Sequence, residues 1–354
     1  PSRVLTNNGD FIQRHAEAVS TLHKVSVIHM ITDQNCKIPI EYSSKKIRNV
    51  HTYIAYVKGT KNPILKLYRF IKAYKHLMSI VGAFDLVHLN KTYPFGILTF
   101  FIRKPLLISE HWTGYHSPKA YNLSLIERFL TRLIIKRAKF VCPVSNDLKK
   151  SMEDIRFSGN YYRIPNVVDT AKFYPLQCKT NDVFTILHIS NMNDDHKNVS
   201  GIIEAVSRLQ ITFKLILLGS NSKKFIPIAK RYNVFKATEF IEHVPHDTVS
   251  DYLNKSDVLV LFSRYENLPC VILESFSCGT PVVSTDVGGI HEFFPDNFGF
   301  LIQKEDTNSL ASCILKTSRV PNPLKTQMHQ YVQDNFSITH IANEFTHLYK
   351  KMLL

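Results

Sequence analysis

The chain has 354 residues, 44% of them hydrophobic, and it contains no run of 18 or more apolar residues. The length suits two domains of about 150 residues each, and we expect neither a transmembrane helix nor an uncleaved secretory signal. The formal net charge is +15, but residues 1–165 hold 26 Lys and Arg against 10 Asp and Glu, whereas residues 166–354 hold 18 against 19. This asymmetry favours an anionic partner for the first half (nucleic acid, a membrane surface or a phosphorylated acceptor) over a merely solvated basic surface.

The first half begins with a predicted helix over 9–22, followed by a predicted strand over 24–31. An α/β domain usually begins with a strand, so we expect a first strand to be missing ahead of this helix; the alternative is a fold without it. Further along, the sequence predicts strands over 84–90, 105–111 and 140–145, and a basic amphipathic helix over 123–140. Strands alternating with helices indicate parallel βαβ units.

The second half repeats this alternation after a segment with weak periodicity. Residues 166–182 are predicted to be a linker between a first domain, 1–165, and a second domain, 183–335. Residues 336–354 are predicted to form a C-terminal helix that packs back toward the first domain. Predicted strands of the second domain end in Gly, Ser or Thr: 184–190, 213–219, 257–263 and 280–285. The sequence therefore predicts two doubly wound α/β domains, whose ligands bind at the carboxyl ends of the strands and in the cleft between the domains.

The six cysteines are not arranged as metal or redox motifs. They include no C-x-x-C pair and no Cys/His cluster with zinc spacing. Most lie in apolar runs, which is typical of reduced thiols in a cytosolic protein rather than of a disulfide framework. The adjacent acids of "NDDHK" (193–197) lack a spaced D-x-D pattern, so we expect no metal in the chemistry.

The stretch "RYENLPCVILESFSCGTP" (264–281) places two acids around a predicted helix start. Pro269 suits the first turn of a helix, and Gly279 suits its end. Glu266 then lies just before the helix, and Glu274 lies about two turns inside it.

Backbone amides at this helix start point toward an anion, namely those of Asn267, Leu268 and the first turn. A carboxylate on either side can accept hydrogen bonds from sugar hydroxyls. The spacing therefore predicts a site for a nucleotide sugar, with its diphosphate at the helix start.

Several ordered motifs resemble the retaining GT-B glycosyltransferases of family 4, over nearly the whole chain. The motifs are "NNGDFIQRHAEA", "SEHWTGY", "IPNVVDTAKFYP", "LHISNMNDDHKN", "VPHDTVSDYLNKSDVLVLFSRYENLPCVILES" and "CGTPVVSTDVGGIHE". The resemblance implies a GT-B fold, that is, two Rossmann-like domains facing across a cleft. It also implies roles for both acids: Glu266 contacts the donor sugar and Glu274 the nucleotide ribose.

The resemblance implies further site residues in the second domain. Lys197 would neutralise the diphosphate as the nucleotide leaves. The family often has an Arg a few residues upstream, where this chain has Ser190 and Asn191. We therefore predict Asn191 as a donor ligand, a polar side chain in place of the family's cation.

In the first domain the resemblance implies that His111 lies near the donor sugar and that Gly9 lets the chain approach the diphosphate. The alternatives are a structural histidine and an ordinary turn. Gly288, Gly289 and Glu292 resemble the family's "GG-x-x-E" turn, which we interpret as mainly structural with a possible donor contact.

The predicted activity is that of a cytosolic retaining glycosyltransferase. It would move a sugar from a nucleotide diphosphate sugar to a glycan or lipid-linked acceptor in surface polysaccharide or lipopolysaccharide synthesis, with no cofactor. No dedicated nucleophile stands out in the sequence. The resemblance implies that the configuration is retained by attack on the front face, with the leaving phosphate taking the acceptor's proton. Alternatives are a GT-B-like nucleotide-sugar epimerase, which needs no acceptor, and a phosphorylase, which needs phosphate. Nucleic-acid binding through the basic half lacks groove-reading motifs.

The basic helices predicted at 66–78 and 126–140 suggest peripheral binding to an anionic membrane that carries the acceptor. The alternative is that their apolar faces pack on the sheet and only their charges meet water.

Overall fold

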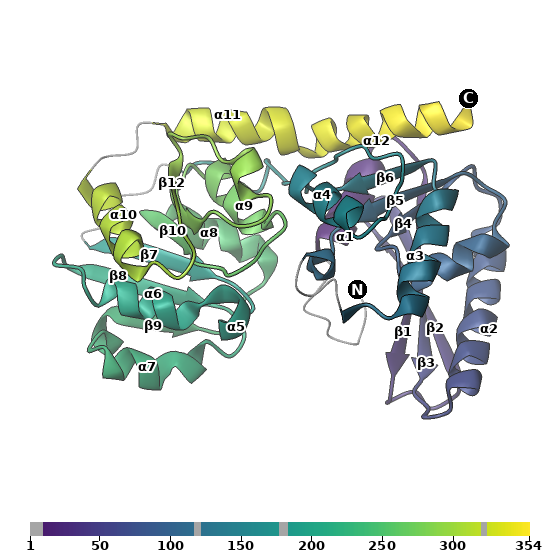
Figure 1. Ribbon diagram of the computed structural model, residues 1–354, viewed down its shortest axis with the longest axis horizontal. Helices are drawn as coiled ribbons and strands as arrows, with labels where there is room; N and C mark the ends of the chain where they lie inside the picture. The colour runs from purple at the N-terminus through teal and green to yellow at the C-terminus, as the bar shows by residue number, and fades with distance from the viewer. Residues whose placement is uncertain (1–9, 117–121, 177–182, 320–323) are drawn as a thin grey trace. The chain divides into compact units, whose positions relative to one another are not determined.

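The computed structural model describes residues 10–116, 122–176, 183–319 and 324–354 (Figure 1). The predicted donor ligand Gly9 lies outside these residues, as do residues 177–182 of the predicted linker. The chain forms two compact units. The first contains Pro1–Val144, Lys149–Val167 and Ile341–Leu354, and the second contains Ser145–Leu148 and Val168–His340. In the described part of the chain, no helix is both long enough and apolar enough to span a bilayer.

The first unit is built from two short sheets and the helices around them. Its strands are β1 (Val25–Asp33), β2 (Ile40–Ile47), β3 (Val50–Lys58), β4 (Val87–Asn90), β5 (Leu106–Glu110) and β6 (Phe140–Pro143). Its helices are α1 (Asp10–Val19), α2 (Pro63–Val81), the short 3-10 helices η1 (Phe95–Phe101) and η2 (Thr113–Tyr115), α3 (Leu125–Arg137) and most of α12 (Ile338–Leu353). The helix α4 (Asn146–Asp154) has its first turn in the second unit.

The strands pair as β1-β3-β2 and as β4-β5-β6. All these pairs are parallel except β2 with β3, which is antiparallel. The strands predicted at 84–90, 105–111 and 140–145 form the parallel sheet β4-β5-β6, as expected. The antiparallel hairpin of β2 and β3, where Arg48 turns the chain with a positive φ of 51°, was not predicted. Among the described residues, β1 and β4 each lie at an edge of their sheet.

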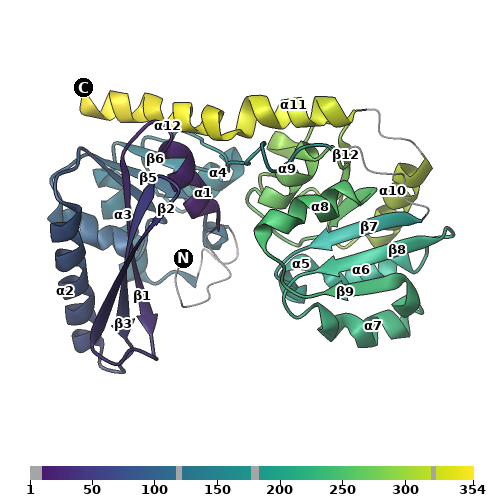
Figure 2. The ribbon, with the colours of Figure 1, turned by 180° about the vertical axis from the view of Figure 1, so that it is seen from behind.

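Helices cover these sheets through apolar stripes. Figure 2 shows α2 running alongside β1 and β3, and its residues Ala73, Tyr74 and Leu77 pack against Ala55 and Val57 of β3. The helix α3 begins one residue after Ser124, which forms a capping box with Glu127. It is shorter than the predicted span 123–140.

The second unit is a six-stranded parallel sheet in the order β12-β11-β10-β7-β8-β9 (Figure 2). Its strands are β7 (Phe184–Ile189), β8 (Phe213–Leu218), β9 (Thr238–Ile241), β10 (Val258–Leu261), β11 (Val282–Thr285) and β12 (Gly299–Ile302). The longer helices are α6 (Val199–Val206), α9 (Cys270–Ser277), α10 (Thr307–Arg319) and α11 (Lys325–Phe336). Shorter elements are α5 (Asp194–Lys197), η4 (Ser222–Phe225), α7 (Ile226–Arg231), η5 (Phe235–Ala237), η6 (His246–Thr248), α8 (Val249–Asn254) and η7 (Ile290–Phe293).

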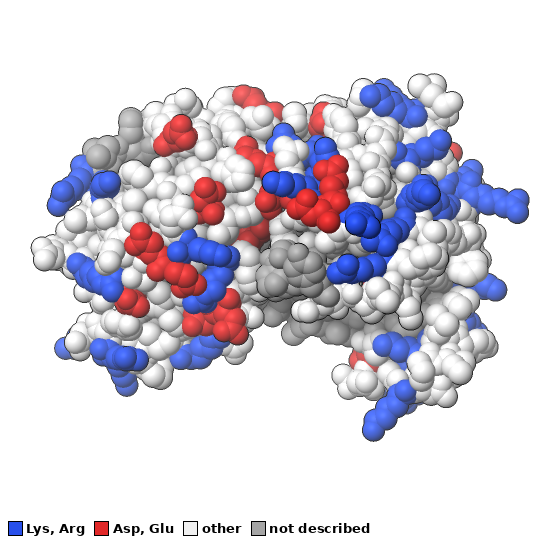
Figure 3. Space-filling model, in the orientation of Figure 1, with Lys and Arg blue, Asp and Glu red and all other residues white. Residues whose placement is uncertain are grey.

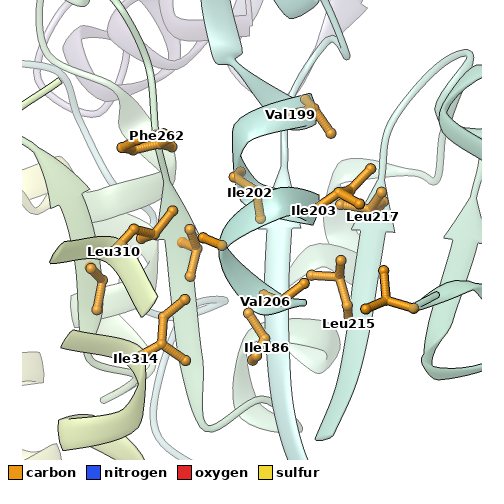
Figure 4. Packing of buried hydrophobic residues seen from close by; sticks show 14 of the residues in the cluster. Ile186, Val199, Ile202, Ile203, Val206, Leu215, Leu217, Phe262, Leu310 and Ile314 are labelled. Atoms are coloured by element: carbon orange, nitrogen blue, oxygen red, sulfur yellow. The ribbon is translucent and has the colours of Figure 1, made fainter. Parts of the chain in front are cut away.

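The core of the second unit lies where α6 and α10 pack on the sheet (Figure 4). Ile186 and Leu215 of the strands contact Ile202 and Val206 of α6, and Leu310 comes from α10. These side chains are fully buried. Their packing fixes the carboxyl ends of β7 and β10, from which the loops of the candidate site extend.

Candidate donor-sugar site

The loop after β10 carries the first acid of the pair. Glu266 is buried, and its carboxylate forms an ion pair with the Lys197 ammonium at the end of α5. His196 Nε2 lies 3.6 Å from Glu266 Oε1. The His196 ring stacks on Tyr265 with centroids 4.1 Å apart, and its Nε2 lies 2.7 Å from the Tyr265 carbonyl oxygen. Burial alone would raise the pKa of Glu266, but Lys197 and His196 outweigh it and lower the pKa to about 2.

Arg264 explains why Lys197 reaches this carboxylate. The Arg264 N–H donates to the His196 carbonyl at 2.8 Å, and its guanidinium donates to the Asp194 carbonyl and to Asn198 Oδ1. Asn198 ends α5 with a left-handed φ of 48° and accepts from Gly201 N–H to begin α6. Arg264 therefore fastens α5 at both ends. This role was not predicted, because a lone Arg in "SRYEN" looks like a solvated charge.

The second acid, Glu274, is buried in α9. Its Oε1 lies 3.0 Å from His246 Nε2, and the His246 ring is 5.1 Å from the buried Phe173 ring. The structure corrects two details of the prediction: Pro269 is the N-cap rather than the first helical residue, and Glu274 lies one turn inside a helix that begins at Cys270. His246 had no signal in the sequence, since only the fold brings it to Glu274.

The "GG-x-x-E" turn holds the loop that carries Glu266. Gly288 has a φ of +60°, and a Cβ there would lie 1.9 Å from the Glu266 carbonyl oxygen. The Gly289 N–H donates to the Asn267 carbonyl at 2.9 Å. Glu292 accepts from the backbone N–H groups of Asn146 and Asp147 at 2.8 and 2.7 Å. The turn thus fixes the loop through its backbone, as the structural interpretation predicts.

The loop after β7 holds the predicted ligand Asn191. Its Oδ1 accepts from Asn193 N–H at 3.2 Å, and the residue is exposed. Beneath it, His188 is fully buried, with Nδ1 2.9 Å from the Val260 carbonyl oxygen and Nε2 2.8 Å from Ser190 Oγ. Burial lowers the pKa of His188 to about 4, so it supports this loop as a neutral ring.

His111 follows β5 in the first unit, and Glu110 fixes its backbone. The buried Glu110 carboxylate accepts from the N–H groups of Thr92, His111 and Trp112 at 2.9–3.0 Å, and from Thr92 Oγ1 at 2.8 Å. This role of Glu110 was not predicted, although an acid within a mostly apolar strand could have indicated it. The His111 ring lies 5.2 Å from the His15 ring, centroid to centroid. Burial, followed by the charges of nearby histidines, holds the pKa of His111 well below its usual range, so the ring is neutral at pH 7.

The structure therefore brings Glu266 and Lys197 into contact, and it places Asn267, Leu268 and Glu274 on the same loop and helix. Asn267 and Leu268 are buried. His111 belongs to the first unit.

Two family models match the chain: residues 11–172 match "Glycosyltransferase Family 4", and residues 178–334 match "Glycosyl transferases group 1". One relative is the N-acetyl-alpha-D-glucosaminyl L-malate synthase of Bacillus anthracis, 26% identical over 48% of this chain and 45% of its own length. This chain thus spans less than half of that relative, and the same holds for other relatives that it matches. Another, 26% identical over 80% of each chain, is the N-acetylgalactosamine-N,N'-diacetylbacillosaminyl-diphospho-undecaprenol 4-alpha-N-acetylgalactosaminyltransferase of Campylobacter jejuni.

Solved structures share the fold. Sucrose-phosphate synthase from Thermosynechococcus elongatus superimposes with a TM-score of 0.81 at 20% identity, over 98% of this chain and 94% of its own. Anabaena HepE in complex with UDP has a TM-score of 0.69 at 16% identity, over 85% of this chain and 86% of its own. Both family models and the parallel sheet of the second unit agree with the motifs in the sequence. The chain belongs to the family 4, group 1 glycosyltransferases and has the GT-B fold.

Proposed function

We propose that this protein is a retaining glycosyltransferase that moves a sugar from a nucleotide diphosphate sugar to a glycan or lipid-linked acceptor. The observation that carries the proposal is the buried ion pair between Glu266 and Lys197 beside the start of α9. Burying a charge pair costs desolvation free energy, which the attraction between the two charges often does not repay. Buried ionisable groups with perturbed pKa values are therefore common at functional sites. Residues 178–334, which contain this pair, match the family model "Glycosyl transferases group 1".

Glu266 acts in this proposal as an acceptor of hydrogen bonds rather than as an acid. With its pKa at about 2 the carboxylate is ionised throughout the working range of pH, so it has no proton to give. It would bind hydroxyl groups of the donor sugar. Lys197 would bind an oxygen of the diphosphate and stabilise the charge that develops as the nucleotide leaves.

Glu274 would accept hydrogen bonds from the ribose hydroxyls, oriented by His246 at 3.0 Å. The amides of Asn267, Leu268 and the first turn of α9 would face the diphosphate, where the helix dipole favours negative charge. HepE, which shares this fold, has been solved with UDP, so UDP-sugars are the first donors to try.

The chemical step is a substitution at the anomeric carbon with retained configuration. The bond from this carbon to the phosphate oxygen breaks, the acceptor oxygen bonds to the same face, and the acceptor's proton passes to the leaving phosphate. His111, as a neutral ring in the first unit, would hydrogen-bond the donor sugar rather than carry a charge to it. Gly9 and Asn191 complete the proposed donor ligands.

We also propose that the acceptor is carried by a membrane lipid and that the protein associates with the membrane surface. The name of the Campylobacter relative contains a diphospho-undecaprenol acceptor. Surface polysaccharide or lipopolysaccharide synthesis is the setting that this chemistry suggests. The basic first half of the chain suits a surface of phosphates.

The test is a panel of nucleotide sugars, scored by thermal shift and by released nucleotide with and without lipid-diphosphate acceptors. We expect one donor to stabilise the protein against heat. Glu274→Gln should lower the affinity for that donor by about tenfold or more and reduce the thermal shift accordingly. Glu239→Gln is the matched control, because Glu239 is a half-exposed acid of the same unit that pairs with Lys214. Product formed without acceptor would indicate an epimerase, and product that requires inorganic phosphate would indicate a phosphorylase; either result would overturn the proposal.

A further inference from the structure

A band of large apolar side chains faces solvent on the first unit. The helix α2 exposes Ile64 (79%), Leu67 (60%) and Tyr68 (60%). The helix α3 exposes Leu125 (84%), Ile126 (70%) and Phe129 (59%). More than half of the large apolar side chains that are exposed in the described part of the chain lie on α2, η1 and α3. Single exposed side chains are ordinary, but a concentration of them marks a binding surface.

These side chains lie outside the part of each helix that packs on the protein. The stripe that packs on the protein contains Ala73, Tyr74 and Leu77 in α2, and Ile134 and Ile135 in α3. In α3 the exposed residues recur at spacings of three and four on the side away from Ile134 and Ile135. In α2 these exposed residues lie in the first two turns, ahead of the residues that pack on the sheet. Packing on the sheet therefore does not account for the exposed apolar residues of either helix.

The 3-10 helix η1 joins the two helices into one surface. The rings of Phe70 in α2 and Phe95 in η1 lie 6.3 Å apart, and Leu98 of η1 packs on the same cluster as α2. Arg137 near the end of α3 donates to the carbonyl of Ile102, directly after η1. In Figures 1 and 2 α2 and α3 lie side by side. We call the exposed parts of α2, η1 and α3 the apolar–basic face.

The charge of this face is almost purely positive. The helix α2 contains no acidic residue, and Lys66, Lys72 and Lys75 are exposed on it. The only acid of α3 is Glu127, whose carboxylate accepts from the backbone N–H and hydroxyl of Ser124 at 2.9 Å. Figure 3 shows Lys and Arg side chains gathered over the part of the first unit where α3 lies.

We infer that the apolar–basic face docks on an anionic lipid bilayer. Its aliphatic and aromatic side chains would enter the boundary between headgroups and acyl chains, while Lys and Arg bind lipid phosphates. The inference rests on the proposed function, because it assumes that the acceptor is bound to a membrane, and it adds the surface by which the protein reaches that membrane. Binding by either signal alone is marginal, so the face needs both its apolar and its basic residues.

The chemistry of the face distinguishes a membrane from other occupants. A nucleic acid would use the lysines, but aliphatic side chains such as Leu125 and Ile126 gain nothing from its phosphates. A second copy of the same face would bring like charges together, which is unfavourable. Of these three occupants, only an anionic bilayer satisfies the apolar and the basic residues at once.

The experiment is flotation of the full chain with vesicles of neutral lipid and with vesicles containing an anionic lipid. We expect binding to the anionic vesicles that weakens with salt. The double variant Ile126→Ser/Phe129→Ser should lower the partition coefficient by about tenfold or more, and so should Lys72→Gln/Lys75→Gln. The control Leu22→Ser, at a half-exposed position away from these elements, should bind as the wild type does.

Two further measurements keep the test decisive. Donor-dependent nucleotide release in the absence of vesicles should be equal in the wild type and all the variants, which separates membrane docking from the proposed transfer activity. Analytical ultracentrifugation without lipid should show the same oligomeric state in all of them. The inference is overturned if the α3 variant still floats like the wild type, if neutral vesicles bind equally well, or if the variants instead abolish a dimer.

Discussion

The ion pair between Lys197 and Glu266 gives a prediction that can be worked through in energy. Its side chains are 13% and 8% exposed, so removing either partner leaves a buried charge without its counterpart. The lowering of the Glu266 pKa from 4.5 to about 2 corresponds to roughly 3 kcal/mol in favour of the charged form. We therefore expect Lys197→Met to destabilise the second unit by about 3 kcal/mol at pH 7.

The sign of the pH dependence follows from the same pair. Because the folded-state pKa of Glu266 is depressed, its contribution to stability is present above pH 4.5 and is lost as the pH falls toward 2. In Lys197→Met, burial raises the pKa of Glu266, so the variant loses less stability relative to wild type at pH 4 than at pH 7. The double variant Lys197→Met/Glu266→Gln should be more stable than Lys197→Met alone, because no buried charge remains.

Urea unfolding followed by far-UV circular dichroism and by tryptophan fluorescence measures this loss of stability and shows whether it is confined to the second unit. The chain has a single Trp, Trp112, which lies in the first unit and serves as the internal control. The matched variant is Lys214→Met, which breaks a half-exposed pair with Glu239 in the second unit and should cost less than about 1 kcal/mol. The reasoning would be refuted if Lys197→Met and Lys214→Met lowered the free energy of unfolding equally. It would also be refuted if the loss in Lys197→Met/Glu266→Gln equalled the sum of the losses in its two single variants.

Three other predictions concern His246, two buried histidines of the first unit and Gly288. His246→Gln should raise KM for the donor several-fold with little change in kcat, because it removes the ring 3.0 Å from the carboxylate of Glu274; an unchanged KM would contradict the role. Burial lowers the pKa of His15 to about 4 and of His88 to about 3. The unfolded chain therefore binds more protons below pH 6.5, and the stability of the first unit, followed by tryptophan fluorescence, should fall between pH 6.5 and 4; a flat profile there would contradict it. Gly288→Ala should lower donor affinity and stability together, because its Cβ would meet a backbone carbonyl at 1.9 Å; differential scanning fluorimetry with and without donor checks this, and a variant that behaves as wild type would show that the loop can move.

The sequence predicted the regular parts of the fold well. The strand predicted at 184–190 is β7, Phe184–Ile189, and the strand predicted at 257–263 contains β10, Val258–Leu261. Both are short apolar runs bounded by polar residues, and a buried parallel strand needs little more than that. The hairpin of β2 and β3 was not predicted, because its pairing depends on contacts that periodicity does not record.

Contacts across long stretches of sequence set the limit for the candidate site. The partner of Glu266 was named only through the resemblance, since Lys197 is 69 residues away. Arg264, Glu110 and His246 hold the site residues in place, yet each looks like an ordinary polar residue in its own segment. Their roles depend on which loops meet at the ends of strands, and a single sequence contains no measure of that.

The two acids of the pair also differ in a way that constrains the chemistry. Glu266 is kept ionised by a cation at contact distance, whereas Glu274 faces a histidine. A group with a pKa of about 2 is a poor base at neutral pH, and it cannot act as the acid. The buried ring of His111 is neutral for the opposite reason, because burial disfavours its charged form. If the protein transfers sugars as proposed, the reaction frees an oxygen on the leaving phosphate. This oxygen is a better proton acceptor than the side chain of Glu266 or of His111.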